Sequence, residues 1–200
     1  MALMHAPEIE THDPEFDPID ELLALREELD FGKCRAEILG GRLIVRPLPV
    51  LWHELACIWL YEAFRDACGQ NGWLASRASE VELPATRDRI QPDLTIFNEA
   101  GKLPPLEHVM PLSQVLLVAE VISPSSVRED REVKPPSCAA AGVPFYLLVD
   151  RFTPKVTVRL HAGPDKEGYL ETHSVPVGGL LKLPEPFGLT LDTGTLPLPK

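Results

Sequence analysis

The sequence predicts a single domain of the mixed α/β (α+β) class, in which helices pack against one mixed central β-sheet. One long segment has the apolar spacing of a helix, whereas several shorter runs are rich in β-branched and aromatic residues. Proline is also frequent, with 21 of 200 residues. Because proline ends helices and central strands, this content favours many short elements with firm ends.

The composition fits an ordinary globular protein. Hydrophobic residues make up 44% and charged residues 24% of the chain, which argues against disorder and against a disulfide scaffold. No apolar run reaches the roughly 18 residues that a transmembrane helix needs. The four cysteines form no CxxC pair, and the first residues lack the pattern of a signal peptide. We therefore expect a cytoplasmic protein with reduced thiols and no membrane partner.

The acidic charge is concentrated near the N-terminus. The formal net charge is −11, yet residues 1–30 hold ten acidic residues and one arginine. The other 170 residues carry 20 acids and 18 bases and are almost neutral, so a nucleic-acid partner is not excluded. We expect residues 1–18 to form a flexible acidic tail and residues 19–200 to form the domain.

The first part of the domain has the pattern of helix, hairpin and helix. Residues 19–29 have helical spacing. Two apolar runs, 35–39 and 43–46, flank Gly40-Gly41, which is a hairpin signal. Residues 51–69 form the longest predicted helix, with Gly69 as its C-cap.

Strands dominate the rest of the domain. We expect strands at 73–77, 80–83, 90–97 and 114–123, and the last of these has the pattern of a central strand buried on both faces. A short helix is expected near 135–141, and further strands at 145–150, 155–161 and 169–175. Residues 176–200 are rich in proline and are expected to form a loop.

Glu120 conflicts with its apolar surroundings. It lies between Val118-Ala119 and Val121-Ile122 in the predicted central strand, where an unpaired carboxylate costs several kcal/mol. Asp93 begins the preceding strong strand, and a divalent cation between the two carboxylates would relieve their repulsion. The alternative is structural: Asp93 caps a turn, and Glu120 pairs with an arginine or lysine.

A series of short motifs occurs in order along the chain: Glu37 to Leu43, Pro92-Asp93, Glu120 to Pro124, Asp130 to Lys134, Ala141 to Tyr146, and Val149-Asp150. Together they resemble the Uma-two-like group of putative restriction endonucleases in the PD-(D/E)XK nuclease superfamily. His53 occupies the place of a histidine often seen after the opening hairpin of that group. The resemblance extends from about residue 30 to residue 160.

This resemblance implies a restriction-endonuclease-like fold, with a mixed central sheet flanked by helices. It implies that Asp93 and Glu120 hold Mg²⁺ or Mn²⁺, that Glu37 is a further acidic member of the site, and that Lys134 is its base. The usual superfamily lysine, two residues after the second acid, is replaced here by Ile122. Lys134 fits the position that the group uses on the following helix.

The residue types suit phosphodiester hydrolysis, because a bound cation stabilises the charge that develops on the phosphate and an ammonium group orients water or neutralises phosphate. Together with the resemblance, they predict a Mg²⁺-dependent endonuclease acting on DNA. The resemblance also implies a homodimer, because relatives that cut both strands often pair.

The alternative is a non-cleaving relative that binds nucleic acid or protein. Pro135-Pro136 supports it, because a residue before proline disfavours helical backbone angles and Lys134 would then point elsewhere. A third interpretation makes the acidic residues 1–30 a phosphate mimic that covers the site.

Other sites find little support in the sequence. The histidines and cysteines lack the spacing of a zinc site, no GxSxG turn indicates a serine hydrolase, and no phosphate-binding glycine loop occurs.

Overall fold

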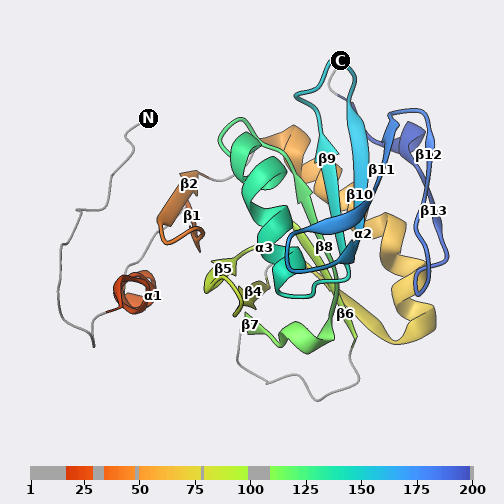
Figure 1. Ribbon diagram of the computed structural model, residues 1–200. Coiled ribbons are helices and arrows are strands. Elements are labelled where there is room, and N and C mark those ends of the chain that lie inside the picture. The colour runs from red at the N-terminus through yellow and green to blue at the C-terminus, as the bar shows by residue number, and fades with distance from the viewer. Residues whose placement is uncertain (1–16, 29–33, 48–49, 78, 99–108, 199–200) are drawn as a thin grey trace.

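The fold is a mixed sheet covered by helices on both faces, with a second, smaller sheet beside it (Figure 1). This computed structural model describes residues 17–28, 34–47, 50–77, 79–98 and 109–198. The predicted class of fold is confirmed. The expectation of one sheet is wrong, however, because the described strands form sheets of six, five and two strands.

The central sheet has the strand order β11-β10-β9-β8-β6-β3. Only β8 and β9 run parallel, and the other neighbouring pairs are antiparallel. Its strands are β3 (Trp73–Ser76), β6 (Leu94–Asn98), β8 (Val115–Val121), β9 (Phe145–Asp150), β10 (Thr157–Pro164) and β11 (Tyr169–Pro176). The strands predicted here are thus confirmed, with ends that shift by a few residues. The exception is the run 90–97, since only its part from Leu94 lies in this sheet and Ile90 ends a strand of the second sheet.

The second sheet has the order β2-β1-β5-β4-β7. Gly40 and Gly41 turn the chain between its first two strands at φ of 57° and 68°, which confirms the predicted hairpin. Positive φ at both central positions is typical of a type I′ turn, where glycine meets no steric penalty. The strands are β1 (Cys34–Ile38), β2 (Leu43–Pro47), β4 (Glu80–Leu83), β5 (Asp88–Ile90) and β7 (Val109–Met110).

Two hydrophobic cores lie on opposite faces of the central sheet. Helix α2 (Leu51–Asn71) covers one face, and α3 (Lys134–Ala140) covers the other (Figure 1). Side chains alternate between the faces along a strand. In β8, Leu117 and Val121 therefore enter the α2 core while Val118 enters the α3 core.

Helix α1 (Pro18–Glu28) packs beside the small sheet. Arg26 donates from Nε to the carbonyl oxygen of Ala36 in β1 at 3.0 Å. Residues 1–16 of the expected tail lie outside the described residues. Pro18, the last residue of that expected tail, is the first residue of α1.

Three of the five described acids near the N-terminus pair with arginines away from the candidate site. Asp17 and Asp20 pair with Arg87, and Glu27 pairs with Arg89 of β5. Neither of these arginines lines the pocket that holds the candidate catalytic residues. In its described part, the acidic segment therefore gives no support to the phosphate-mimic interpretation.

Helix α2 is longer than the sequence predicted. It continues through Gly69 to Asn71, and Gly72 is its C-cap in the left-handed region, with φ of 67°. The prediction of Gly69 as the cap is therefore wrong, because the backbone conformation that favours a C-cap glycine is found three residues further on.

The C-terminal segment is ordered, contrary to the expectation of a loop. It forms β12 (Leu180–Lys182), β13 (Thr190–Asp192) and a 3-10 turn at Thr193–Thr195. Leu181, Phe187 and Leu191 enter the α2 core, and Phe187 makes edge contacts with the rings of Phe64, Trp73 and Phe145. These strands are too short and too interrupted by proline to give a clear pattern.

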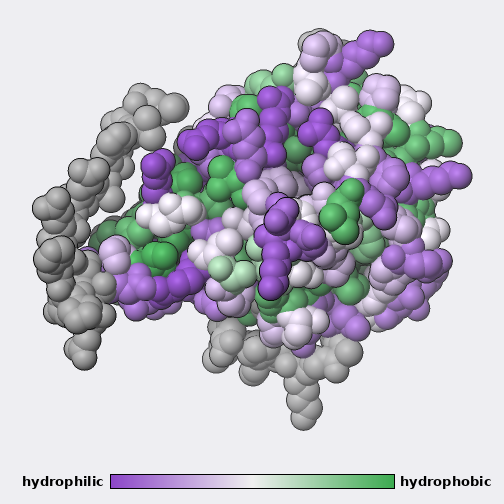
Figure 2. Space-filling model, in the orientation of Figure 1, coloured by the Kyte–Doolittle hydropathy of each residue, from purple (hydrophilic) through white to green (hydrophobic). Residues whose placement is uncertain are grey.

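The four cysteines are free, as expected, although Cys34 is exposed while the other three are buried. Polar and apolar residues are interspersed over the face shown in Figure 2. Among the described helices, none is long and apolar enough to cross a membrane.

We predict that Phe187→Ala destabilises the fold by roughly 3–5 kcal/mol, because it removes a buried ring and leaves a cavity. Urea unfolding measures the change. Leu180→Ala is the matched control, since Leu180 is 63% exposed in the same segment, and it should change stability by less than about 0.5 kcal/mol. Equal effects of the two variants would contradict an integral C-terminal segment.

We also predict that His161 makes the fold less stable in acid. Burial, aided by the charge of Arg159, lowers the pKa of His161 to about 4. The unfolded chain therefore protonates His161 at a higher pH than the folded protein does. The stability that the protein has with His161 neutral is complete above about pH 6.5 and is lost progressively as the pH falls toward 4. Between pH 7 and pH 4.5, the urea midpoint of His161→Gln should fall less than that of the unsubstituted protein. His173→Gln, which changes an exposed histidine, should behave like the unsubstituted protein.

Candidate active site

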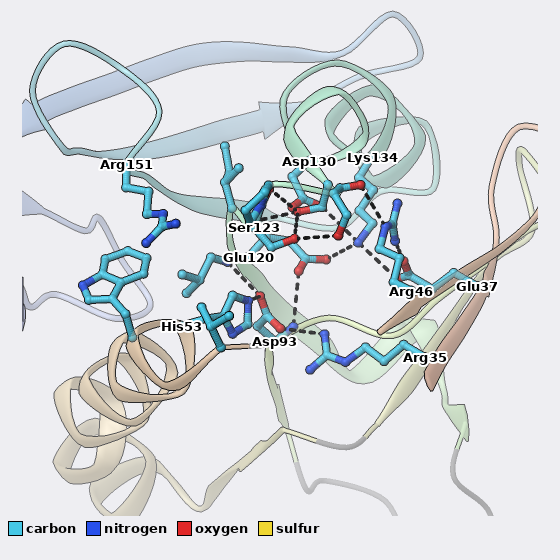
Figure 3. Close-up of a pocket in the computed structure, with 17 residues that line it drawn as sticks. Arg35, Glu37, Arg46, His53, Asp93, Glu120, Ser123, Asp130, Lys134 and Arg151 are labelled. Atoms are coloured by element: carbon cyan, nitrogen blue, oxygen red, sulfur yellow. Dashed lines mark hydrogen bonds and ion pairs between the residues drawn. The ribbon is translucent and has the colours of Figure 1, made fainter. Parts of the chain in front are cut away.

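A pocket of about 250 Å³ opens where the two sheets and the two helices meet (Figure 3). It receives side chains from the hairpin, the start of α2, the beginning of β6, the end of β8, α3 and the end of β9. The charged residues and histidine that line it are Arg35, Glu37, Arg46, His53, Asp93, Glu120, Asp130, Lys134 and Arg151.

Glu120 points to the face of β8 that α3 covers. Strand alternation places it on the same face as Val118, whereas Ala119 and Val121 face α2. Its side chain is 2% exposed, and its Oε1 lies 2.8 Å from Nζ of Lys134. This ion pair is the one that the structural alternative expected, in which Glu120 pairs with an arginine or lysine.

Lys134 binds three carboxylates at once. Its Nζ lies 3.0 Å from Glu37 Oε1, 2.8 Å from Glu120 Oε1 and 3.1 Å from Asp130 Oδ1. The contact with Glu120 is a hydrogen bond, whereas the contact with Asp130 Oδ1 is an ion pair without one.

The expectation that Pro135 turns Lys134 away from the site is wrong. Lys134 has helical angles, φ −64° and ψ −42°, and its side chain is 3% exposed. A π-helical turn, Glu129–Val133, leads directly into α3, and the amide of Lys134 donates to the carbonyl oxygen of Glu129. In this turn an amide bonds to the carbonyl group five residues before it. Pro135 and Pro136 therefore lie in the first turn of α3, where the helix needs no N–H donor.

Glu37 reaches the pocket from β1. Its Oε2 pairs with Arg46 of β2, and its Oε1 accepts a hydrogen bond from the amide of Gln91 at 2.9 Å. Together with Lys134, these partners fix the carboxylate from three directions.

Asp93 lies just before β6, beside the end of β8. Its Oδ2 accepts a hydrogen bond from the amide of Val121 at 2.9 Å and lies 3.0 Å from His53 Nε2. Its Oδ1 lies 2.6 Å from Arg35 Nη1. The amide of Asp93 in turn donates to Glu120 Oε2 at 3.4 Å, so the two acids are adjacent in the pocket, as Figure 3 shows.

Burial and charge divide the four carboxyl groups into two kinds. Burial raises the pKa of Glu120 and Asp130 above their ordinary values, and Lys134 only partly opposes this. The pKa of Glu37 stays low despite burial because Lys134 and Arg46 favour its charge. The pKa of Asp93 is lowered as well, since the hydrogen bond from His53 and the charge of Arg35 outweigh burial.

Two sets of side chains could hold a metal ion, and Asp93 belongs to both. Asp93 and Glu120 offer the hard oxygen ligands that Mg²⁺ prefers. His53, Cys57 and Asp93 offer ligand atoms that all lie within 4.8 Å of one another. In the second set His53 Nδ1 lies 3.5 Å from Cys57 Sγ, and burial raises the pKa of this thiol, which opposes metal binding by the thiolate.

The structure brings together all four residues that the sequence singled out: Glu37, Asp93, Glu120 and Lys134. It adds Asp130, Arg35, Arg46 and Arg151. Asp130 could have been found, because it lies four residues before Lys134 and so shares its helical face. Arg35 carries no local signal, since its partner Asp93 is distant in sequence. Arg151 carries none either, because it lies on the ring of Trp52, almost a hundred residues away.

Comparisons with known proteins point to one family and one fold. The family model described as "Uma2: Putative restriction endonuclease" matches residues 19–194. The fold is similar to the crystal structure of a putative nuclease of DUF820 from Anabaena variabilis ATCC 29413, with a TM-score of 0.67. The two chains are 19% identical, and the similarity covers 89% of this chain and 96% of the other. No curated protein matches the chain.

We predict that Lys134→Met destabilises the fold by roughly 3–5 kcal/mol at pH 7, because it leaves buried carboxylates without their cation. Without the charge of Lys134, the pKa values of the buried carboxyl groups rise further. The loss of stability should therefore shrink toward pH 5, where these groups take up protons in the folded state. Urea unfolding at both pH values measures it.

Exposed Lys166→Met is the control and should have little effect. Adding Glu120→Gln to Lys134→Met should restore part of the stability, because it removes one of the unpaired charges. A loss that is equal at both pH values and unrelieved by Glu120→Gln would contradict the charge network.

Proposed function

This chain belongs to the Uma2 family of putative restriction endonucleases, as its ordered motifs predicted, and on that premise we propose that it is a metal-dependent endonuclease that hydrolyses phosphodiester bonds in DNA. One observation supports this function above the others. Asp93 and Glu120, from neighbouring antiparallel strands, place adjacent carboxyl groups in a pocket that also holds Lys134.

The donor set fits a hard divalent cation. Four buried carboxyl groups, Glu37, Asp93, Glu120 and Asp130, line the pocket together with three cations that pair with them: buried Arg46 and Lys134, and half-buried Arg35. With all seven of these groups charged, they carry one negative charge in excess; Arg151, which lines the same pocket, is left out of this sum because, among the described residues, it pairs with none of the four carboxylates. The raised pKa values of Glu120 and Asp130 reflect this excess as well as burial. A bound metal cation can compensate this excess negative charge, as a proton on one of the carboxyl groups would do in its absence.

Asp93 and Glu120 would hold the ion, with Mg²⁺ proposed and Mn²⁺ as the alternative. When bound, the ion supplies a Lewis acid that polarises the phosphate and lowers the pKa of water. Glu120 Oε2 is the freer ligand atom of this carboxylate, since the amide of Asp93 donates to it at 3.4 Å whereas Lys134 holds Oε1 at 2.8 Å.

The other residues hold this arrangement in place. Lys134 fixes Glu120 and Glu37 through its ammonium group, and His53 and the amide of Val121 fix Asp93. Preorganised groups of this kind need little rearrangement when charge develops on the reacting phosphate. In this role Lys134 is a positioning residue, because its ammonium group already pairs with three carboxylates.

A protein of this family that binds nucleic acid without cutting it is the second candidate. The three ion pairs of Lys134 and the isoleucine at position 122 favour it, because the pocket, in its described part, then has no unpaired lysine to act on a phosphate or on water. Calorimetric titration with Mg²⁺ and Mn²⁺ separates the candidates, since the nuclease requires binding in the millimolar range or tighter.

We predict that the purified protein cleaves plasmid DNA with Mg²⁺ or Mn²⁺ and that Asp93→Asn lowers the rate at least roughly 100-fold, because it removes a charged ligand of the ion. Gel analysis of supercoiled plasmid over time measures the rate.

Asp66→Asn is the matched control, since it changes an exposed carboxylate of α2, and it should cleave at the original rate. Circular dichroism checks that both variants fold. Absence of cleavage by the unsubstituted protein with either ion, or equal cleavage by Asp93→Asn, would overturn the proposed activity.

A further inference from the structure

We propose that Arg151, stacked on Trp52, binds a phosphate group of the nucleic acid backbone beside the group that reacts. This inference rests on the proposed function, because it assigns that substrate a second contact in the same pocket. It concerns binding rather than chemistry, so it can be tested without cleavage.

The charges of the pocket single out this arginine. Arg35 pairs with Asp93, Arg46 with Glu37, and Lys134 with three carboxylates. Arg151 also lines the pocket, yet among the described residues it forms neither an ion pair nor a hydrogen bond. Its guanidinium therefore keeps its charge and donors available for an anion that enters from outside.

The guanidinium is nevertheless held in one place. Its central carbon lies 4.8 Å from the centre of the Trp52 ring and 4.9 Å from that of the Phe152 ring. Such contacts attract a cation to the face of an aromatic ring and leave the edge donors of the guanidinium free. Trp52 is itself anchored, since its Nε1 donates to the carbonyl oxygen of Pro197 at 2.7 Å.

The backbone around Arg151 is fixed as well. Asp150, the last residue of β9, receives two hydrogen bonds of 2.8 Å from Arg131. It also accepts a hydrogen bond from the amide of Phe152 at 2.9 Å. The turn that carries Arg151 is thus held on both sides, so little ordering is needed when an anion binds.

The position of Arg151 suits a polyanion that extends through the pocket. Figure 3 shows Arg151 at one end, Arg35 and Arg46 at the other, and Glu120 and Asp93 between them. A phosphodiester at the two acids would have neighbouring phosphates on either side. Arginine binds phosphate oxygens in a paired geometry that suits this contact, and backbone contacts of this kind position a nucleic acid without reading its sequence.

The test is binding of a fluorescein-labelled DNA duplex, measured by anisotropy in EDTA so that cleavage plays no part. Arg151→Ala should weaken binding roughly tenfold, as expected for one charge-assisted contact. It should also make the salt dependence shallower by about 0.9, the value for one phosphate contact on a duplex. The affinity of Arg151→Lys should fall between those of the unsubstituted protein and Arg151→Ala. Lysine keeps the positive charge but lacks the planar guanidinium that stacks on Trp52 and binds two oxygens at once.

Arg159→Ala is the matched control. Arg159 is a half-buried arginine of β10 that lies outside the pocket and, within the described part of the chain, forms no ion pair. It should leave both the affinity and the salt dependence unchanged. Equal effects of Arg151→Ala and Arg159→Ala would overturn the proposal, because they would indicate a diffuse charge effect.

Inorganic phosphate distinguishes a free anion from a nucleic acid. Calorimetry should find phosphate alone much weaker than the duplex, and tight binding of phosphate that depends on Arg151 would overturn the nucleic-acid contact. If the protein never cleaves DNA but Arg151→Ala still weakens duplex binding, the proposed activity fails and this inference stands. If cleavage occurs and Arg151→Ala binds normally, the inference fails and the activity stands.

Discussion

The ammonium group of Lys134 lies within 3.1 Å of carboxylate oxygens from three separate elements: Glu37 of β1, Glu120 of β8 and Asp130 of the π-helical turn. Each carboxylate would be costly to bury alone, and removal of its cation would leave an uncompensated buried charge. Lys134 of α3 therefore joins the small sheet, through Glu37, to the central sheet, through Glu120. The geometry of the pocket depends on this one cation.

The central sheet determines which residues can reach that point. Strand alternation sends Glu120 toward α3, while the antiparallel pairing of β6 with β8 brings Asp93 beside it. The hairpin supplies Glu37 and Arg35, two residues apart on one strand and hence on the same face. Each functional side chain thus projects from a rigid element or from its end, which keeps the acids in a fixed relation.

The charges of the pocket divide into two groups with different consequences. The acids and their paired cations nearly cancel, with a small negative excess that suits a hard cation or a proton. Arg151 stands apart from this balance and keeps its charge for a partner from outside. A protein body that is almost neutral can therefore still present a local positive charge where a polyanion would enter.

The sequence by itself determined most of the elements and the family. Gly40-Gly41 predicted the hairpin because two positive φ angles require glycine, and Glu120 was conspicuous because a carboxylate is rare in an apolar strand. Only the tertiary structure decided that Lys134 points inward, that Arg151 lacks a carboxylate partner among the described residues, and that the C-terminal segment completes a core. Local patterns reflect the geometry of neighbouring residues, whereas ion pairs and packing between distant segments depend on how the whole chain folds.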